Sequence, residues 1–195
     1  MSAADRPSIV QRAETLAHSK WVLPVLLAIE IAETTFVPLP YEALFIALCA
    51  AARERTWMFV AITMLGSAIG GSILYLLGVS FADSVAAMFG AEAALAELTA
   101  VFAERGASFI LLGGTTPAPS YLINLAAGAS SYPYLNFLVL FSLSRFIRFA
   151  ILGLLIYYFG DEIAGAWKRL PKWLRRLLTV LIAGAIVYWF ASGFV

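Results

Sequence analysis

The sequence predicts an all-α integral membrane protein, an inverted repeat in which each half is a re-entrant helical hairpin followed by a transmembrane helix. An extra C-terminal transmembrane helix completes the chain. The first observation behind this prediction is composition: 62% of the 195 residues are hydrophobic, 13% are charged, and the mean hydropathy is +0.89. Soluble domains are about half apolar and about a quarter charged. The bilayer is therefore the expected solvent. The second and third observations are two proline-split apolar blocks and the distribution of basic residues between blocks.

The chain divides into apolar blocks that we assign to one membrane domain, residues 1–195. A spanning helix needs roughly 20 apolar residues. In order, we expect a cytoplasmic N-terminal segment (1–20), a first re-entrant hairpin (21–52), a transmembrane helix (56–79), an interfacial helix (83–104), a second re-entrant hairpin (106–130) and two transmembrane helices (134–159 and 173–195). The N-terminal segment lacks an apolar region of signal-peptide type and could form a short amphipathic helix. A polar-faced connecting helix is an equally good interpretation of 83–104.

Each of the two long blocks contains a Pro-x-Pro in its interior. Pro38 and Pro40 interrupt the first block, and Pro117 and Pro119 interrupt the second. Proline removes a backbone donor and clashes with the preceding turn, so a pair of prolines ends a helix. Each block therefore predicts two short helices that meet at a break. Aligned on the prolines, TTFVPLPYE and TTPAPSYL match, which indicates a repeat.

Basic residues predict the orientation of these blocks. They occur in segments 1–20, 53–55 and 168–176, which should be cytoplasmic, whereas segment 80–106 has one arginine among four acids and should face the other side. The N-terminus is then cytoplasmic and the C-terminus lies on the outer side. The two hairpins enter from opposite faces, as in the inverted repeats of secondary transporters.

The breaks should present polar groups at membrane depth. Backbone that leaves a helix there must bond to protein or water, because lipid offers no partner. The polar side chains that we assign to the two tips are those of Thr34, Thr35, Thr116, Ser120, Tyr121 and Asn124, next to the four prolines. Helices that start near Tyr41 and Ser120 direct their positive dipole ends at this region, which favours an anionic group.

Charged residues inside apolar blocks point to the same region. Glu30, Glu33 and Glu42 lie in the first hairpin, and Arg145 and Arg148 lie within 134–159. A charge at the bilayer centre costs roughly 2.5–3.5 kcal/mol on insertion scales, so these residues need partners or a purpose. The two arginines share a helix face, arginine suits phosphate, and a glutamate can carry a proton. Two structural alternatives stay open: the arginines only pair with Glu33 and Glu42, and Glu30 is solvated near the interface.

Other residues carry weaker signals. A single cysteine, Cys49, excludes an intrachain disulfide, and the single histidine, His18, is expected at the surface. We expect no metal and no cofactor, and the net charge of +1 gives no reason to expect nucleic acid. Glycines at 66, 70 and 71, with Ser67, are typical of close helix packing.

At these residues the chain resembles the DedA family, also called the VTT or SNARE-associated family, and within it the YqaA-like subgroup. ETTFVPLPYE is similar to the motif E-S-x-F-x-P-x-P-x-(D/E), GSAIGGSILYLLG to a glycine-rich helix that ends in Tyr-x-x-Gly, TTPAPSYLINLAAG to the second hairpin, and SLSRFIRF to G-R-x-x-R-F. The chain departs at Tyr121, where the subgroup usually has lysine, and at Ser144, where it has glycine. The arginines that flank the second-hairpin proline in better-known members are absent.

The resemblance implies lipid movement across the membrane, since members are linked to undecaprenyl phosphate recycling, phospholipid scrambling and maintenance of the proton motive force. It points to Glu33, Glu42, Arg145 and Arg148 as the functional residues, with Glu30 as an addition. We therefore expect a flippase or scramblase of the bacterial inner membrane, with anionic lipid phosphate and protons as partners and a homo-oligomer as an option. The alternative is a non-transporting scaffold or assembly factor whose charges only hold the fold. An enzyme ranks last, because no nucleophile–base pair is evident.

Overall fold

The computed structural model of the chain describes residues 14–35, 41–88, 90–115 and 120–169, together with Pro171 and Gly184, and contains no strand in them. The all-α prediction is confirmed for this part of the chain. The elements are α2 (Val22–Thr35), α3 (Tyr41–Ala51), the 3₁₀ turn η2 (Arg53–Arg55), α4 (Thr56–Met88), α5 (Glu92–Thr115), α6 (Ser120–Ala129) and α7 (Tyr134–Arg169).

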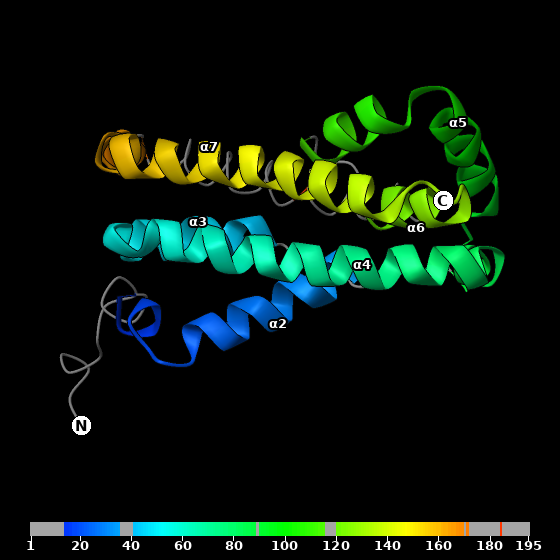
Figure 1. Cartoon of the computed structure of the whole chain (residues 1–195). Helices are drawn as coiled ribbons and strands as arrows, with labels where there is room; N and C mark the ends of the chain where they lie inside the picture. Colours follow the sequence, from blue (N-terminus) through cyan, green and yellow to red (C-terminus); the bar gives the residue numbers. More distant parts are fainter. Residues whose placement is uncertain are drawn as a thin grey trace.

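Helices α4 and α7 form the long axis of the molecule and run antiparallel to each other (Figure 1). Two segments are long and apolar enough to cross a bilayer, Arg53–Met88 with a mean hydropathy of 1.9 and Tyr134–Gly160 with 2.0. They contain the predicted spans 56–79 and 134–159. The predicted span 173–195 lies outside the described residues except for Gly184.

The exterior of the bundle differs from that of a water-soluble helical bundle. Large apolar side chains are exposed along the long helices, with Leu76 61% exposed and Val139 64% exposed. The interior is mainly apolar and forms two hydrophobic clusters, but it also contains polar side chains, of which those of Glu30, Asn124 and Ser144 are completely buried. Apolar surface outside and polar groups inside are what a lipid environment favours.

Each proline-split block forms two helices, as predicted. In the first block, α2 and α3 lie on either side of residues 36–40; in the second, the end of α5 and α6 lie on either side of residues 116–119. The prolines themselves lie outside the described residues. Helix α2 packs on α4 and α3 on α7, whereas α5 packs on α7 and α6 on α4 (Figure 1). Each long helix therefore contacts one short helix from each block.

The prediction of a single helix over residues 83–104 is wrong. Helix α4 continues to Met88 after a non-helical residue at Phe81, and α5 begins only at Glu92, with a second non-helical residue at Arg105. Gly90 lies between the two helices with φ +62°, in the left-handed region that glycine adopts without steric cost. The chain reverses there, so the acidic connection is two helical segments joined by a turn.

Glycine allows α4 and α6 to pack very closely. A Cβ added at Gly128 would lie 2.0 Å from the carbonyl oxygen of Tyr75, and one added at Gly78 would lie 2.2 Å from that of Leu125. Both distances are far below van der Waals contact. Small residues at such crossings let helix backbones approach in a membrane, where the hydrophobic effect does not drive association.

Candidate functional site

The last two turns of α2 place three polar side chains on one helix face. Glu30, Glu33 and Thr34 are separated by three and four residues, the spacing of neighbours on a helix surface. The Thr34 hydroxyl lies 3.2 Å from Oε1 of Glu30 and 3.4 Å from Oε2 of Glu33, so it can donate to either carboxylate. Thr35 instead donates to the Ile31 carbonyl oxygen at 2.5 Å, a bond within its own helix.

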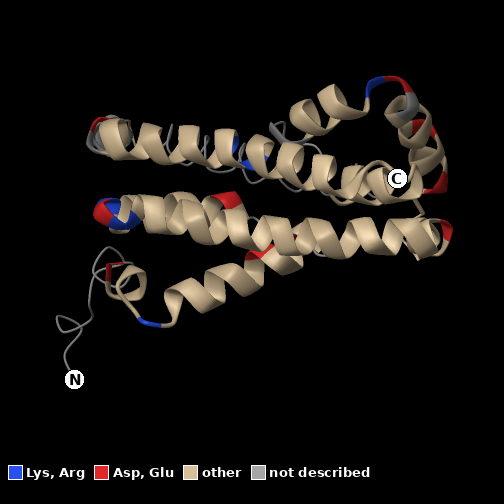
Figure 2. Cartoon of the chain, viewed as in Figure 1, with Lys and Arg blue, Asp and Glu red and all other residues tan. Residues whose placement is uncertain are grey.

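Two ion pairs join the first broken block to α7. Arg145 Nη2 lies 3.7 Å from Oε2 of Glu33 on α2, and Arg148 Nη2 contacts Oε1 of Glu42 at the start of α3. The arginines share a face because they are three residues apart on α7. The structure thus brings together the four residues that the sequence analysis singled out. Figure 2 shows acidic residues in the second half of α2 and at the start of α3, and basic residues on α7.

The two pairs differ in depth. The Arg145 side chain is 4% exposed, and its guanidinium carbon lies 5.4 Å from the centre of the Phe141 ring, a cation–π contact. In the outer pair, Arg148 is 15% exposed and Glu42 is 43% exposed. An anion from outside the bundle would therefore meet the Arg148–Glu42 pair first.

Glu30 is completely buried, so the interpretation that it is solvated near the interface is wrong. Ser67 of α4 donates a hydrogen bond to Oε1 of Glu30, the oxygen that also accepts from Thr34. The sequence analysis assigned Ser67 to packing and missed this role. A serine among glycines can allow close helix packing or can donate a hydrogen bond to a neighbouring helix. The two roles are distinguished only by whether an acid lies at the facing position of that helix.

The neighbouring glycines do pack closely, as predicted. A Cβ at Gly66 would lie 2.7 Å from the Glu30 side chain, and one at Gly70 would lie 2.8 Å from Cβ of Thr34. These glycines let the polar face of α2 reach the backbone of α4.

The second broken block contributes neutral polar groups. Asn124 is completely buried, and neither atom of its amide group has a hydrogen-bond partner within the described part of the chain. Tyr121 is partly buried against an apolar cluster. Ser120 opens α6, but its side chain lies outside what the structure describes, as do Pro38, Pro40, Thr116, Pro117 and Pro119.

Asn124 nevertheless lies near the arginine face. A Cβ added at Gly71 would meet the Phe141 ring at 2.7 Å and Asn124 Nδ2 at 3.6 Å. Arg145 lies over the same Phe141 ring, so Asn124 and Arg145 lie in one region of the bundle.

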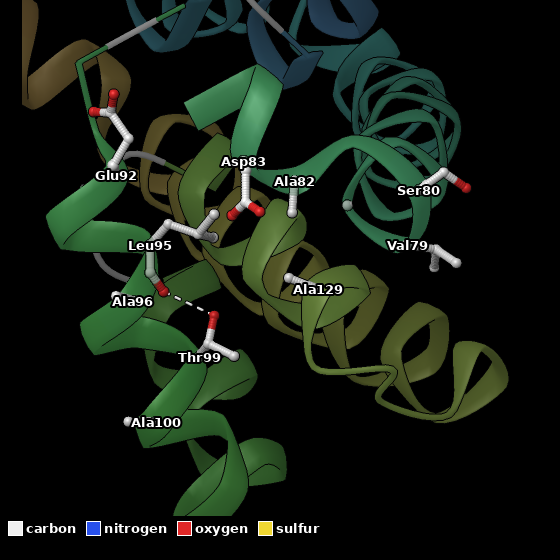
Figure 3. Close-up of a pocket in the computed structure, with 11 residues that line it drawn as sticks. Val79, Ser80, Ala82, Asp83, Glu92, Leu95, Ala96, Thr99, Ala100 and Ala129 are labelled. Atoms are coloured by element: carbon white, nitrogen blue, oxygen red, sulfur yellow. Dashed lines mark hydrogen bonds between the residues drawn. The ribbon is translucent and has the colours of Figure 1, made fainter. Parts of the chain in front are cut away.

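A cavity of about 560 Å³ lies elsewhere, where the end of α4 meets α5 and α6 (Figure 3). Small and apolar side chains form most of its wall, with Asp83 and Glu92 at its edge, and Thr99 donates to the Leu95 carbonyl oxygen at 2.8 Å. Both carboxylates are exposed, and no arginine lines the cavity among the residues that the structure describes. The buried ion pairs define the stronger candidate site. Burying charge in an apolar bundle is costly, so such charges indicate a function, whereas the exposed carboxylates at the cavity carry no such cost.

A separate charged contact lies at the other end of the bundle. The single histidine, His18, is exposed as predicted; its Nε2 lies 2.8 Å from Oε1 of Glu54, and its Nδ1 lies 2.9 Å from the carbonyl oxygen of Glu14. Arg55 donates to the carbonyl oxygen of Ala17, which is completely buried. These contacts fasten residues 14–18 to the turn between α3 and α4. The hydrogen bond to the Glu14 carbonyl, and next that to Glu54, raise the pKa of His18.

An apolar exterior and two helices of spanning length indicate an integral membrane protein. The VTT domain family matches residues 39–162, more than half of the chain. The protein belongs to this family of membrane proteins, which is commonly linked to transport, and the predicted resemblance to the DedA or VTT family is confirmed.

An uncharacterized protein of Haemophilus influenzae is 24% identical over 140 residues, which cover 70% of this chain and 73% of that protein. No solved structure matches the chain.

Proposed function

We propose that this protein is a carrier that moves an anionic lipid, such as undecaprenyl phosphate, across the bilayer, with the lipid phosphate bound by Arg145 and Arg148. The observation that carries the proposal is the pair of arginines on one face of α7, each opposed by a carboxylate from a different short helix. A guanidinium fork can exchange a carboxylate for a phosphate with little change in geometry. The headgroup can therefore replace Glu42 first and Glu33 second.

Protons are the proposed means of release. A protonated Glu33 or Glu42 no longer attracts its arginine as an anion, so the guanidinium is freed for the phosphate. The outer pair is the better entry point, because Glu42 is 43% exposed whereas Glu33 is 23% exposed. On this scheme each arginine exchanges one anionic partner for another, a carboxylate for the phosphate, which limits the cost of its charge in a low-dielectric interior.

The pattern of helix contacts supports an inverted repeat, because in each half one helix of the broken block packs on the long helix of its own half and the other packs on the long helix of the other half. Contact α2–α4 in the first half corresponds to α5–α7 in the second, and α3–α7 corresponds to α6–α4. A pseudo-twofold arrangement of this kind suits alternating access, in which one half rocks against the other around a central site. The re-entrant depth of both blocks belongs to the same proposal.

The transport test uses purified protein in liposomes. We expect a C55 phosphate, or a fluorescent phospholipid with an anionic headgroup, to cross faster than in empty vesicles, and faster still with an imposed proton gradient. Arg148→Ala should reduce flux by about tenfold or more, since it removes a charge-assisted interaction of roughly 1.5–3 kcal/mol with the phosphate. Glu42→Gln should abolish the acceleration by the proton gradient, since it fixes position 42 in a neutral form. Lys20→Ala and Glu97→Gln, exposed residues far from the site, serve as matched controls. Wild-type flux in both site variants would exclude this mechanism.

A scaffold is the second candidate, and the ion pairs themselves favour it. If the pairs only fix α2 and α3 against α7, then the swapped variant Glu42→Arg/Arg148→Glu should fold and complement a deletion strain, because the pairing survives. A carrier should lose flux in that variant while keeping wild-type thermal stability. The two outcomes separate the candidates with one double variant.

The expectation that the protein is not an enzyme stays a prediction, as do its homo-oligomeric state, its placement in a bacterial inner membrane and the orientation of its ends.

A further inference from the structure

The charges inside the bundle do not balance. Three carboxylates, those of Glu30, Glu33 and Glu42, lie near two guanidinium groups, which leaves 2 − 3 = −1. Glu33 and Glu42 each have an arginine partner, whereas Glu30 makes no ion pair within the described part of the chain. A buried and unbalanced carboxylate is costly in a medium of low dielectric constant.

The hydrogen bonds around Glu30 are one-sided. Oε1 accepts from the hydroxyl groups of both Ser67 and Thr34, while Oε2 is buried and has no hydrogen-bond partner among the described residues. Two donors on one oxygen suit an ionised carboxylate. A proton on Oε2 would turn it into a donor that also lacks an acceptor, so protonation would not satisfy this atom.

We propose that Glu30, Ser67 and Thr34 bind a small monovalent cation of the size of Na⁺ between α2 and α4. Unlike a proton on Oε2, a metal cation does not need a hydrogen-bond acceptor, because the lone pairs of oxygen atoms hold it. Ser67 gives its hydrogen to Oε1 and Thr34 gives its hydrogen to Glu30 or Glu33, so the lone pairs of both hydroxyl oxygens are free to join Oε2 around the ion. Hard oxygen ligands suit hard cations, and a single positive charge makes the interior neutral.

Two further features fit this site. Gly66 and Gly70 remove the side chains that would otherwise separate α2 from α4, so the oxygens of the two helices can meet around one ion. Asn124 on α6 lies against the adjacent Gly71 and has a buried amide oxygen with no partner in the described part of the chain. Asn124 therefore continues the row of buried polar groups from Glu30 toward the second block.

The site is connected to the arginine pair through Thr34. That hydroxyl has one hydrogen and lies within reach of Glu30 and of Glu33, the partner of Arg145. A cation at Glu30 therefore changes the electrostatic field at Glu33 and Arg145. A coupling role for this cation rests on the proposed carrier function, whereas the binding site itself does not.

Direct binding of ²²Na⁺ to the purified full-length protein tests the site. We expect saturable binding of one ion per chain that choline does not displace. Glu30→Gln should abolish it, and Ser67→Ala should weaken it by roughly tenfold, the lower end of losses for residues that orient a ligand. Glu97→Gln, which removes an exposed carboxylate far from the site, should bind as the wild type does.

Protons provide a second measurement that needs no variant. The other ionisable groups that act on Glu30 are Glu33 on α2, Tyr41 on α3, and Arg145 and Arg148 on α7. If Na⁺ and a proton compete for Glu30, sodium affinity should fall as the pH is lowered from 9 to 6. Absence of saturable binding across that range would overturn the proposal and leave Glu30 as a proton site, and binding that survives both Glu30→Gln and Ser67→Ala would also overturn it.

Lipid flux, measured separately, distinguishes this failure from failure of the carrier. Flux that needs Arg148 but ignores sodium would keep the carrier and remove the coupling. Sodium binding without flux would keep the site and remove the carrier.

Discussion

The two broken blocks share a sequence pattern but are held in place by different interactions. Both consist of two helices with a Pro-x-Pro between them, and both contact α4 and α7. The first block is attached through charged and hydrogen-bonding side chains. The second is attached through close backbone packing.

In the first block the attachments are electrostatic. Arg145 pairs with Glu33, Arg148 pairs with Glu42, and Ser67 donates to Glu30. When the prolines of the two blocks are aligned, the position of Glu42 corresponds to Tyr121, so the second block has no carboxylate there.

In the second block the attachments are steric. Gly78 and Gly128 bring α4 and α6 almost into backbone contact, and the Tyr75 hydroxyl donates to the Tyr132 carbonyl oxygen at 2.5 Å. Contacts of this kind do not change with pH, salt or ligand. Because its contacts are charged, the first block can respond to ions, whereas the second block is the fixed support.

The largest effect should come from breaking the inner ion pair. Arg145→Met leaves Glu33 in the bundle without its cation, and removal of one partner from a buried pair typically costs about 3–5 kcal/mol. Thermal and denaturant unfolding of the purified protein measure the loss. The double variant Arg145→Met/Glu33→Gln should recover much of it, because the stranded charge is gone. If the two losses simply add, the pair is not coupled and the first block is not held by charge.

A smaller effect should come from the packing of the second block. Gly128→Ala places a methyl group 2.0 Å from a backbone oxygen that cannot rotate away, so α6 must shift, at a cost of about 1–3 kcal/mol. Gly153→Ala is the matched control, since its nearest neighbour is the Thr56 methyl group at 2.9 Å, a side-chain atom.

The loss in Gly128→Ala should be the same at pH 6 and pH 9 and in sodium or choline salts. Any dependence on ions would contradict the assignment of the second block as a fixed support.

The sequence predicted the features that depend on local rules. Proline pairs end helices wherever they occur, so both blocks were predicted as two helices. The cost of burying charge, with the spacing of Arg145 and Arg148, predicted that the arginines would face the acids of the first block.

The features that depend on the relative placement of helices could not be predicted. The depth of Glu30 and its bond with Ser67 require the register of α2 on α4, which glycines at 66 and 70 permit but do not specify. The break within 83–104 requires the positive φ of Gly90, and glycine adopts either sign of φ equally well.

The smallest effect concerns the contact between His18 and Glu54, two exposed residues that flank the first block. It is a shift in the pKa of His18, and it follows from the contacts of the two ring nitrogens. Nε2 faces a carboxylate oxygen of Glu54 and Nδ1 faces the carbonyl oxygen of Glu14, so both nitrogens meet acceptors and both must carry hydrogen to bond. Arg55 acts in the opposite direction, but the pKa of His18 is raised above its ordinary 6.5. A raised pKa in the folded protein means that the stabilisation is fully present below pH 6.5 and is lost as the pH rises through the raised value.

Since the chain has one histidine, its ring resonance in a ¹³C-histidine NMR titration is unambiguous. We expect a midpoint above 6.5 that moves down in Glu54→Gln and stays unchanged in Glu97→Gln. A midpoint at 6.5 in the wild type would show that residues 14–18 are not held by charge, and the electrostatic character of the first block would then be confined to its buried pairs.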